Sequence, residues 1–444
     1  MTTDRRQFLA ATSSAFAALA LSGCMRGTPV SGAMAVPGSM PLAMPYGPLR
    51  PDPAGILDLP EGFSYRVLSQ LGEPMADGGT VPDRADGMGC FDLGDGRLAL
   101  VRNHELSVTH DGGGAHGPAY DTLARSLVPL PGGTTTIILD AATLEVQTQF
   151  RSLQGTIRNC AGGITPWGSW LTCEEDVTTP NGRANKDHGW VFEVPATATG
   201  PVDPVPLKAM GRFNHEAACV DPATGIVYMT EDRSDSLLYR FLPVTPGKLA
   251  DGGQLQALAL NGIADTRNWD ARSMAVGDWA DASWIDLDEV ESPEEDLRKR
   301  GAAAGAALFA RGEGLWMGEG EFYFTCTSGG AIKEGQVFRL QTGSAGAPDR
   351  LQLFVESDDQ AAFSFGDNLT IAPGGHLIVC EDQYTETVTN HLRGITPEGA
   401  VYPFAFLRLQ TEPAGVCYAP DGKTLFVNLY SPTRTLAITG PWIA

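Results

Sequence analysis

Basic residues and histidines are scarce in this sequence. Lysine and arginine together number 31 against 53 aspartates and glutamates, histidines number 7, and the formal net charge is −22. Nucleic acids and anionic lipids repel a chain of this charge, so we expect it to bind neither of them electrostatically. Excess acid keeps an exported protein soluble, and clustered carboxylates can also bind cations.

Long apolar runs are also missing. The N-terminal apolar stretch ends near Leu21 and is too short and too rich in Ala and Ser to span a membrane. It follows Arg5 and Arg6, and the whole segment resembles a twin-arginine export signal. Residues 21–24 (LSGC) resemble the lipobox of bacterial lipoproteins. We therefore expect a periplasmic or cell-surface protein, either lipid-anchored at Cys24 or cleaved near it without lipidation.

The sequence contains no CxxC pair. Seven cysteines follow Cys24, and this odd number leaves at least one thiol outside any disulfide, free or bound to something else. Free cysteines pack as small apolar residues, so we expect most of them to be buried.

Strongly amphipathic helices are few, whereas 53 glycines and 31 prolines indicate many turns. One pattern occurs six times: a short apolar run, a turn with Gly or Asp-Gly, a second apolar run, and a polar or acidic end. Each copy has the length of a β-hairpin. The copies begin near Asp86, Asn159, His215, Glu313, Asp367 and Pro413.

Six hairpins in one domain predict an all-β fold, a six-bladed β-propeller with a few inserted helices; a double-sheet sandwich is the alternative. One helix is expected over residues 293–311, where Ser292 precedes Pro293 as a reasonable N-terminal cap. We assign residues 1–24 to the signal peptide, 25–54 to a flexible tether and 55–444 to a single propeller domain.

Acidic or thiol residues occupy two positions in these repeats, the start of the first strand and the end of the second. Both positions lie at one mouth of the channel on which the innermost strands of a propeller converge. Crowded carboxylates destabilise a fold unless cations neutralise them; Ca²⁺ suits carboxylates, and a thiolate suits a transition metal such as iron or zinc. The first position holds Asp86, Cys160, Glu216, Glu313 and Asp367; the second holds Glu105, Glu174 or Glu175, Glu231 or Asp232, and Glu381 or Asp382.

Arginines near this acidic mouth are candidates to bind an anionic substrate. A guanidinium can donate two parallel hydrogen bonds to a phosphate or carboxylate, and we select Arg158, Arg233 and Arg393 for this role. Surface ion pairs are the alternative for each of them. His104 and His215 are expected to be hydrogen-bonded structural residues.

Several sequence blocks resemble the PhoX family of bacterial alkaline phosphatases. The longest runs from residues 159–163 (NCAGG) through 165–168 (TPWG) to 171–175 (LTCEE). The resemblance extends from about residue 55 to the C-terminus. Further matching blocks are 213–216 (FNHE), 313–316 (EGLW), 367–369 (DNL), 380–382 (CED), 419–422 (APDG) and 440–442 (GPW).

The resemblance implies a propeller whose channel mouth holds a mixed cluster of Fe³⁺ and Ca²⁺. By position it implies that Cys160 supplies a thiolate ligand to iron, with Cys173 packed beneath the site. The remaining implied metal ligands are Glu174 or Glu175, Glu216, Glu231, Glu313, Asp367 and Glu381.

The resemblance also implies an activity, the release of phosphate from small organic esters by a phosphomonoesterase; separately, we expect a monomer. Clustered metals can stabilise the charge of an in-line displacement, and the sequence shows no convincing nucleophilic triad. Two alternatives stay open. One is a calcium-dependent lactonase or esterase on a six-bladed propeller, and the other is a non-catalytic lipoprotein stabilised by metals.

Overall fold

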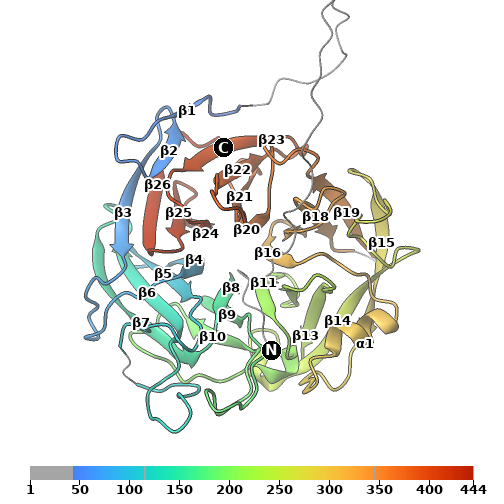
Figure 1. Ribbon diagram of the computed structural model, residues 1–444, viewed down its shortest axis with the longest axis horizontal. Helices are drawn as coiled ribbons and strands as arrows, with labels where there is room; N and C mark the ends of the chain where they lie inside the picture. Colours follow the sequence, from blue (N-terminus) through green and yellow to red (C-terminus); the bar gives the residue numbers. More distant parts are fainter. Residues whose placement is uncertain (1–43, 115–116, 344–345, 444) are drawn as a thin grey trace, which may run out of the picture. The chain divides into compact units, whose positions relative to one another are not determined.

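The computed structural model describes residues 44–114, 117–343 and 346–443. Their regular secondary structure is almost entirely β-strand, which confirms the predicted all-β class. The sheets stand around a common centre in a propeller-like arrangement (Figure 1). Among the described residues, no helix is long and apolar enough to cross a membrane. The predicted export signal, Cys24 and most of the tether lie outside the described residues.

The centre is formed by six antiparallel hairpins, one for each copy of the sequence pattern. Their first strands contact one another in a closed ring, in the order in which they follow along the chain. The hairpins are β4 (Ala85–Asp92) with β5 (Arg97–His104), β8 (Asn159–Ile164) with β9 (Ser169–Glu174), β11 (His215–Val220) with β12 (Val227–Glu231), β16 (Gly312–Met317) with β17 (Glu321–Cys326), β20 (Gly366–Ile371) with β21 (Leu377–Glu381), and β24 (Pro413–Tyr418) with β25 (Thr424–Leu429).

The ring is tight because small residues line it. A Cβ atom at Gly163 of β8 would lie only 1.9 Å from the carbonyl oxygen of Ala218 in β11, closer than any real contact. Glycine at this position therefore lets two neighbouring first strands pack backbone against backbone.

The outer strands pair with these hairpins in five sheets. The number is five because β15 pairs with β19, for example Trp279 with Gln352, which joins the third and fourth hairpins in one nine-stranded sheet. The outer strands are β6 (Gly132–Asp140), β7 (Val146–Thr156), β10 (Val191–Pro195), β13 (Tyr239–Pro243), β14 (Gly253–Leu260), β15 (Trp279–Asp286), β18 (Gln336–Gln341), β19 (Asp349–Glu356), β22 (His391–Ile395), β23 (Val401–Leu407) and β26 (Arg434–Thr439).

Strands near the start of the described chain complete the last two sheets. β3 (Ser64–Gln70) pairs with the C-terminal strand β26, and β2 (Leu57–Pro60) pairs with β23 and with the short β1 (Leu49–Arg50). Tyr46, in the segment that we predicted to be part of the tether, packs against the rings of Phe63, Phe404 and Trp442. The sheet that contains the end of the chain therefore also contains one of its first described strands.

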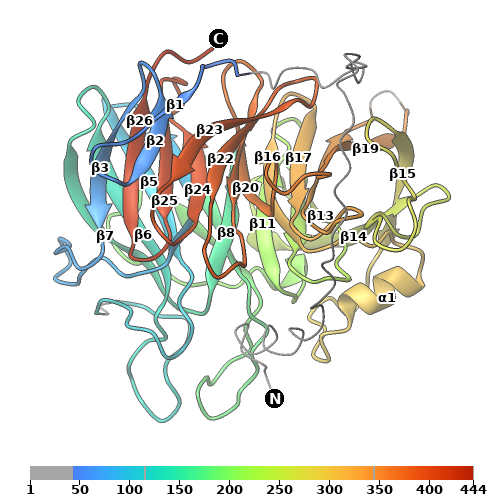
Figure 2. The same ribbon diagram turned by 45° about the horizontal axis from the view of Figure 1, so that its top comes forward.

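The predicted helix over residues 293–311 is shorter than expected. It forms only as α1 (Leu297–Ala303). Glu295 has a φ of 53°, which prevents an earlier start, and the chain leaves the helix at Gly305, which has a φ of 107°. Ser292 does serve the helix start, because its hydroxyl accepts the backbone N–H groups of Asp296 and Leu297. The long connections that follow β5 and β9 project on the same side as α1 (Figure 2).

Candidate active site

One backbone hydrogen bond repeats in all six hairpins, just beyond the strand ends. The residue after the second strand donates its N–H to the carbonyl of the residue before the first strand, at 2.9–3.2 Å. We call the residue after the second strand the post-strand position and the residue before the first strand the pre-strand position. The residue two places after the pre-strand position is called the inner position. The six bonds run from Glu105 to Arg84, Glu175 to Arg158, Asp232 to Asn214, Thr327 to Arg311, Asp382 to Phe365 and Tyr430 to Glu412.

A β-bulge lies at the inner position or directly after it in every hairpin. In the first hairpin, for example, Ala85 pairs with His104, but the next pair is Met88 with Arg102, so the chain has one extra residue there. The same shift occurs in the other five hairpins. A bulge changes the direction of a side chain at a strand end, and here it recurs at the position that holds carboxylates and the thiol.

The inner and post-strand positions bring seven acidic or thiol residues together in one cluster. Their donor atoms form three overlapping groups, each with all its atoms within 4.8 Å of one another. The sulfur of Cys160 lies 3.5 Å from Oδ2 of Asp86. The groups are Asp86, Glu105 and Cys160; Cys160, Glu175 and Glu216; and Glu216, Glu313 and Asp367.

Several carboxylate oxygens in this cluster are buried without a hydrogen-bond donor. Within the described part of the chain, neither oxygen of Glu216 has a partner, nor has Oδ1 of Asp86. Burial, together with repulsion from neighbouring carboxylates, raises the pKa of Asp86, Glu216, Glu313 and Asp367 well above its usual range. Buried acceptors that lack a donor are costly, and a bound cation satisfies them. The donor set therefore fits metal ions: oxygen ligands for a hard cation and one sulfur for a transition metal.

Three arginines at equivalent pre-strand positions surround this cluster: Arg84, Arg158 and Arg311. Their φ angles are 57°, 48° and 57°, in the left-handed region that a non-glycine residue adopts only when its surroundings hold it there. The shared conformation gives the three side chains the same relation to the ring.

Two of these arginines link neighbouring carboxylates. Arg158 pairs with both Glu105 and Glu175. Arg311 binds Asp232 at 2.7 Å and Glu313 at 2.8 Å, and it also donates to the hydroxyl of Tyr384.

Arg84 has a different partner. Its guanidinium donates to the hydroxyl of Tyr430 at 2.7 Å, and this hydroxyl in turn donates to Glu105. Within residues 44–114, 117–343 and 346–443, Arg84 forms no ion pair with a carboxylate, so its positive charge is the least compensated of the three.

The other two predicted arginines lie elsewhere. Arg233 binds Glu295 at 2.9 Å and the side-chain oxygen of Asn214, which occupies a pre-strand position. Arg393 is buried on β22, where it donates to Glu381 and to the carbonyl of Ala361. Of the predicted substrate-binding arginines, the structure thus brings only Arg158 into the cluster.

Three predicted metal ligands are also placed away from the cluster: Glu174, Glu231 and Glu381. Glu174 accepts four N–H groups, one from the connection before β8 and three from the connection after β9. Glu231 accepts the hydroxyl of Tyr239, and Glu381 accepts Arg393 and two backbone N–H groups. Each is the last residue of its strand, and side chains alternate along a strand, so the next residue faces the mouth instead. The structure therefore does not bring these three predicted ligands into the cluster, and of the alternatives Glu174 and Glu175 it places Glu175 there.

The expected ligand set omits residues that the structure places in the cluster. Asp86 and Glu105 belong to it and follow the same pattern as the predicted ligands. Arg84 and Arg311 were not selected either. The signal for them is a spacing: an arginine lies two residues before Asp86, Cys160 and Glu313 alike. His104 and His215 are buried and hydrogen-bonded to backbone carbonyls, as expected.

Comparison with known proteins identifies a family and a fold. A family model described as alkaline phosphatase PhoX matches residues 44–142 and 132–433. The solved structure of Pseudomonas fluorescens PhoX in complex with vanadate, a transition-state analogue, superposes with a TM-score of 0.67 at 20% identity, over 87% of this chain and 96% of that one. A gluconolactonase from Xanthomonas campestris superposes with a TM-score of 0.42 at 14% identity, over 89% and 98%. A search of proteins with curated descriptions found no match.

Proposed function

Since the chain belongs to the PhoX family of alkaline phosphatases and is therefore a phosphomonoesterase, we propose that its reaction takes place at the mouth of the ring. The observation that carries this proposal is the cluster around Glu216, whose two buried oxygens have no donor among the described residues. Metal ions bound there would meet the phosphate of a small organic ester beside the three arginines.

The ligands would be divided between two kinds of metal. Cys160 lies in two of the three donor groups, so iron would bind at the sulfur, and Ca²⁺ would bind where only carboxylates converge, as around Glu313 and Asp367. When bound, such metals supply positive charge that neutralises the phosphate and stabilises the transition state of an in-line displacement.

The arginines would bind and orient the phosphate. A guanidinium presents two parallel donors to a phosphate oxygen pair, and this geometry aligns the ester with the metals. Arg84 has only a neutral hydroxyl as its direct partner, so it is the best placed of the three to bind an incoming anion. Arg158 and Arg311 would exchange a carboxylate contact for the substrate once metals hold those carboxylates.

We also propose that the six hairpins are the inner halves of six blades. The closed ring of first strands and the six equivalent backbone hydrogen bonds support this view. The β15–β19 pairing then joins the outer edges of two blades without removing either of them.

We propose in addition that the protein is exported through the twin-arginine pathway, is lipid-anchored at Cys24 and is a monomer. The N-terminal sequence supports the export and the anchor. The family match favours phosphate esters over the two alternatives that the sequence left open, the calcium-dependent lactonase or esterase and the non-catalytic lipoprotein.

The experiment that tests this proposal combines metal analysis with activity. Protein made through its own export route should contain both iron and calcium and hydrolyse 4-nitrophenyl phosphate. Glu216→Gln should lose metal and at least about tenfold in kcat/KM, because metal-site substitutions typically cost that much or more. Glu145→Gln is the matched control, because it changes an exposed carboxylate directly before β7. It should change neither the metal content nor kcat/KM. Full activity in metal-free protein would contradict the proposal.

A further inference from the structure

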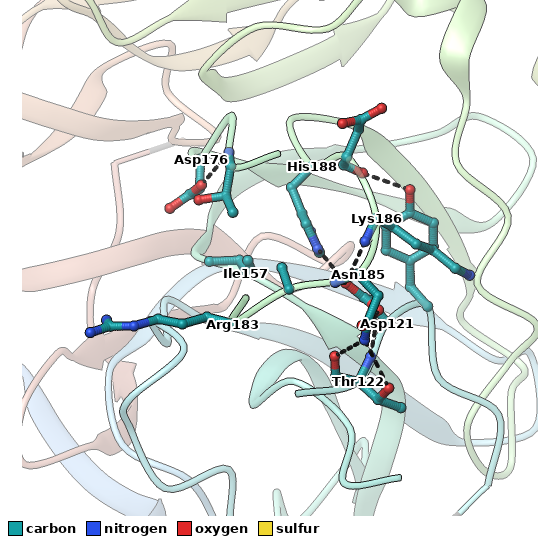
Figure 3. A network of polar contacts seen from close by, with 12 residues as sticks. Asp121, Thr122, Ile157, Asp176, Arg183, Asn185, Lys186 and His188 are labelled. Carbon is teal, nitrogen blue, oxygen red and sulfur yellow. Dashed lines mark hydrogen bonds and ion pairs between the residues drawn. The ribbon is translucent and has the colours of Figure 1, made fainter. Parts of the chain in front are cut away.

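A buried histidine joins two carboxylates directly beside the active-site cluster. His188 lies between Glu174 and Asp121, with Nδ1 2.6 Å from Oε1 of Glu174 and Nε2 3.3 Å from Oδ2 of Asp121. All three side chains are almost fully buried. Figure 3 shows His188 close to Asp121 and to the chain around Asn185 and Lys186.

The geometry defines the protonation of His188. A carboxylate oxygen without a proton can only accept a hydrogen bond, and here one faces each ring nitrogen, so both nitrogens donate and the ring is an imidazolium. Burial disfavours this charged form, but the two carboxylates outweigh it and raise the pKa of His188 above its usual value.

Asp121 anchors this histidine to two long connections. Its carboxylate accepts the backbone N–H groups of Thr122, Asn185 and Lys186 (Figure 3). Asp121 lies in the connection after β5, and His188 lies in the connection after β9. The two connections that project beside the mouth are therefore joined to each other through buried charges.

Glu174 connects His188 to the backbone beside Arg158. The oxygen of Glu174 that binds His188 also accepts the backbone N–H of Ile157 at 2.9 Å, one residue before Arg158. The carbonyl of Arg158 accepts the N–H of Glu175, and its own N–H donates to Leu106. The left-handed conformation of Arg158 is intrinsically unfavourable, so these bonds are what keep it in place.

We propose that His188 is a positioning residue for substrate binding, which acts through Glu174 to keep Arg158 directed into the mouth. The inference rests on the proposed role of Arg158 in binding phosphate. Without the imidazolium, Oε1 of Glu174 loses its charged donor and keeps only the N–H of Ile157, while Oε2 keeps the N–H groups of Gly189 and Trp190. The carboxylate can then rotate, which weakens one of the hydrogen bonds that hold the backbone at Arg158. The metal ligands keep their own contacts, so the effect should fall on phosphate binding.

The test is a double-mutant cycle measured on the metal-loaded enzyme. His188→Gln should raise the KM for 4-nitrophenyl phosphate and the inhibition constant of inorganic phosphate by about tenfold, with a smaller change in kcat and unchanged metal content. Arg158→Gln should raise both constants as well. The double variant should resemble Arg158→Gln alone, since His188 has nothing left to position.

His376→Gln is the matched control. This histidine is also buried, but its ring binds the hydroxyl of Tyr402 in the sheet of β22 and β23. It should leave KM unchanged. Should His188→Gln fail to fold, Asp121→Asn weakens the same chain of hydrogen bonds more gently and should change KM in the same direction.

The outcomes separate the two proposals. If Arg158→Gln leaves KM unchanged, Arg158 does not bind phosphate, and the positioning role of His188 is contradicted as well. If Arg158→Gln raises KM but the effect of His188→Gln adds to it in full, Arg158 keeps its role and His188 does not act through it.

Discussion

Glu174 and Glu175 are neighbours in the chain, yet their carboxylates serve opposite sides of one strand end. Glu174 is enclosed by four N–H groups and takes no part in the cluster. Glu175 reaches the mouth, where it pairs with Arg158 and lies within 4.8 Å of donor atoms of Cys160 and Glu216. The division between structural carboxylates and those of the cluster thus falls between adjacent residues.

Glu216 allows a prediction that separates folding from metal binding. Its buried carboxylate has no donor in the described chain, so Glu216→Gln should leave the metal-free protein at least as stable as the metal-free wild type. In the presence of metals the same variant should be less stable than wild type, because it binds them less well. Thermal unfolding with and without a chelator measures both differences. An equal loss of stability in both states would show that Glu216 is a structural residue.

Cys160 and Cys173 form a matched pair of buried thiols. Cys160 lies in the cluster, whereas Cys173 packs among apolar side chains of the core. Cys160→Ser should lower the iron content and reduce kcat/KM by at least about tenfold. Cys173→Ser should keep both and lose about 1–2 kcal/mol of stability, since it buries a hydroxyl in an apolar site. Metal analysis, kinetics and urea unfolding of the two variants check this, and equal iron content in both would contradict it.

Asp52 gives a prediction about pH. It accepts the hydroxyl of Tyr65 at 2.6 Å and the backbone N–H groups of Ala54, Ile56 and Leu57. Burial alone would raise its pKa, but these donors lower it from 3.8 to about 2. The unfolded chain therefore takes up this proton first, so the stabilisation is complete above about pH 4 and is lost as the pH falls through about 2.

Asp52→Asn should accordingly cost about 1–2 kcal/mol at pH 7. The difference from wild type should stay constant down to about pH 4 and shrink at pH 3, as measured by urea unfolding at each pH. A difference that is the same at pH 3 and pH 7 would mean that the charge of Asp52 contributes nothing.

Gly163 tests the close contact between two first strands. An added methyl group would lie 1.9 Å from the carbonyl oxygen of Ala218, and neither backbone can move away without opening the ring. Gly163→Ala should destabilise the protein by about 2–3 kcal/mol. Gly200→Ala adds the same methyl group where nothing lies within 4 Å and should change stability by less than about 0.5 kcal/mol. Similar unfolding midpoints for the two variants would refute the tight ring.

The six central hairpins could be predicted from the sequence because turn residues separate apolar runs of strand length, and both signals are local. The pairing of β15 with β19 could not, because it joins strands that are more than sixty residues apart and leaves no local pattern. The helix that we predicted over residues 293–311 is longer than the observed one, because the sequence does not show that Glu295 takes a positive φ.

The sequence could narrow a carboxylate of the site to two adjacent residues at the end of a hairpin, but it could not say which of the two faces the mouth. The choice between Glu174 and Glu175, Glu231 and Asp232, or Glu381 and Asp382 depends on which way a side chain points where regular pairing ends. Strand alternation settles that direction only when the last paired residue is known. Arg84 and Arg311 were missed for a related reason, since their side chains enter the mouth from residues outside the strands.

The pairing of β3 with β26 has a consequence for the order of events when the protein is made. One of the first strands to be synthesised must wait for the last before its sheet can form. The cluster likewise draws on residues from Asp86 to Asp367, so it is complete only when most of the chain has left the ribosome. Pairings between such distant segments form slowly. The complete set of donor groups therefore cannot assemble before Asp367 has been made and the fifth hairpin has joined the ring, and we expect metal loading to be completed only after that point.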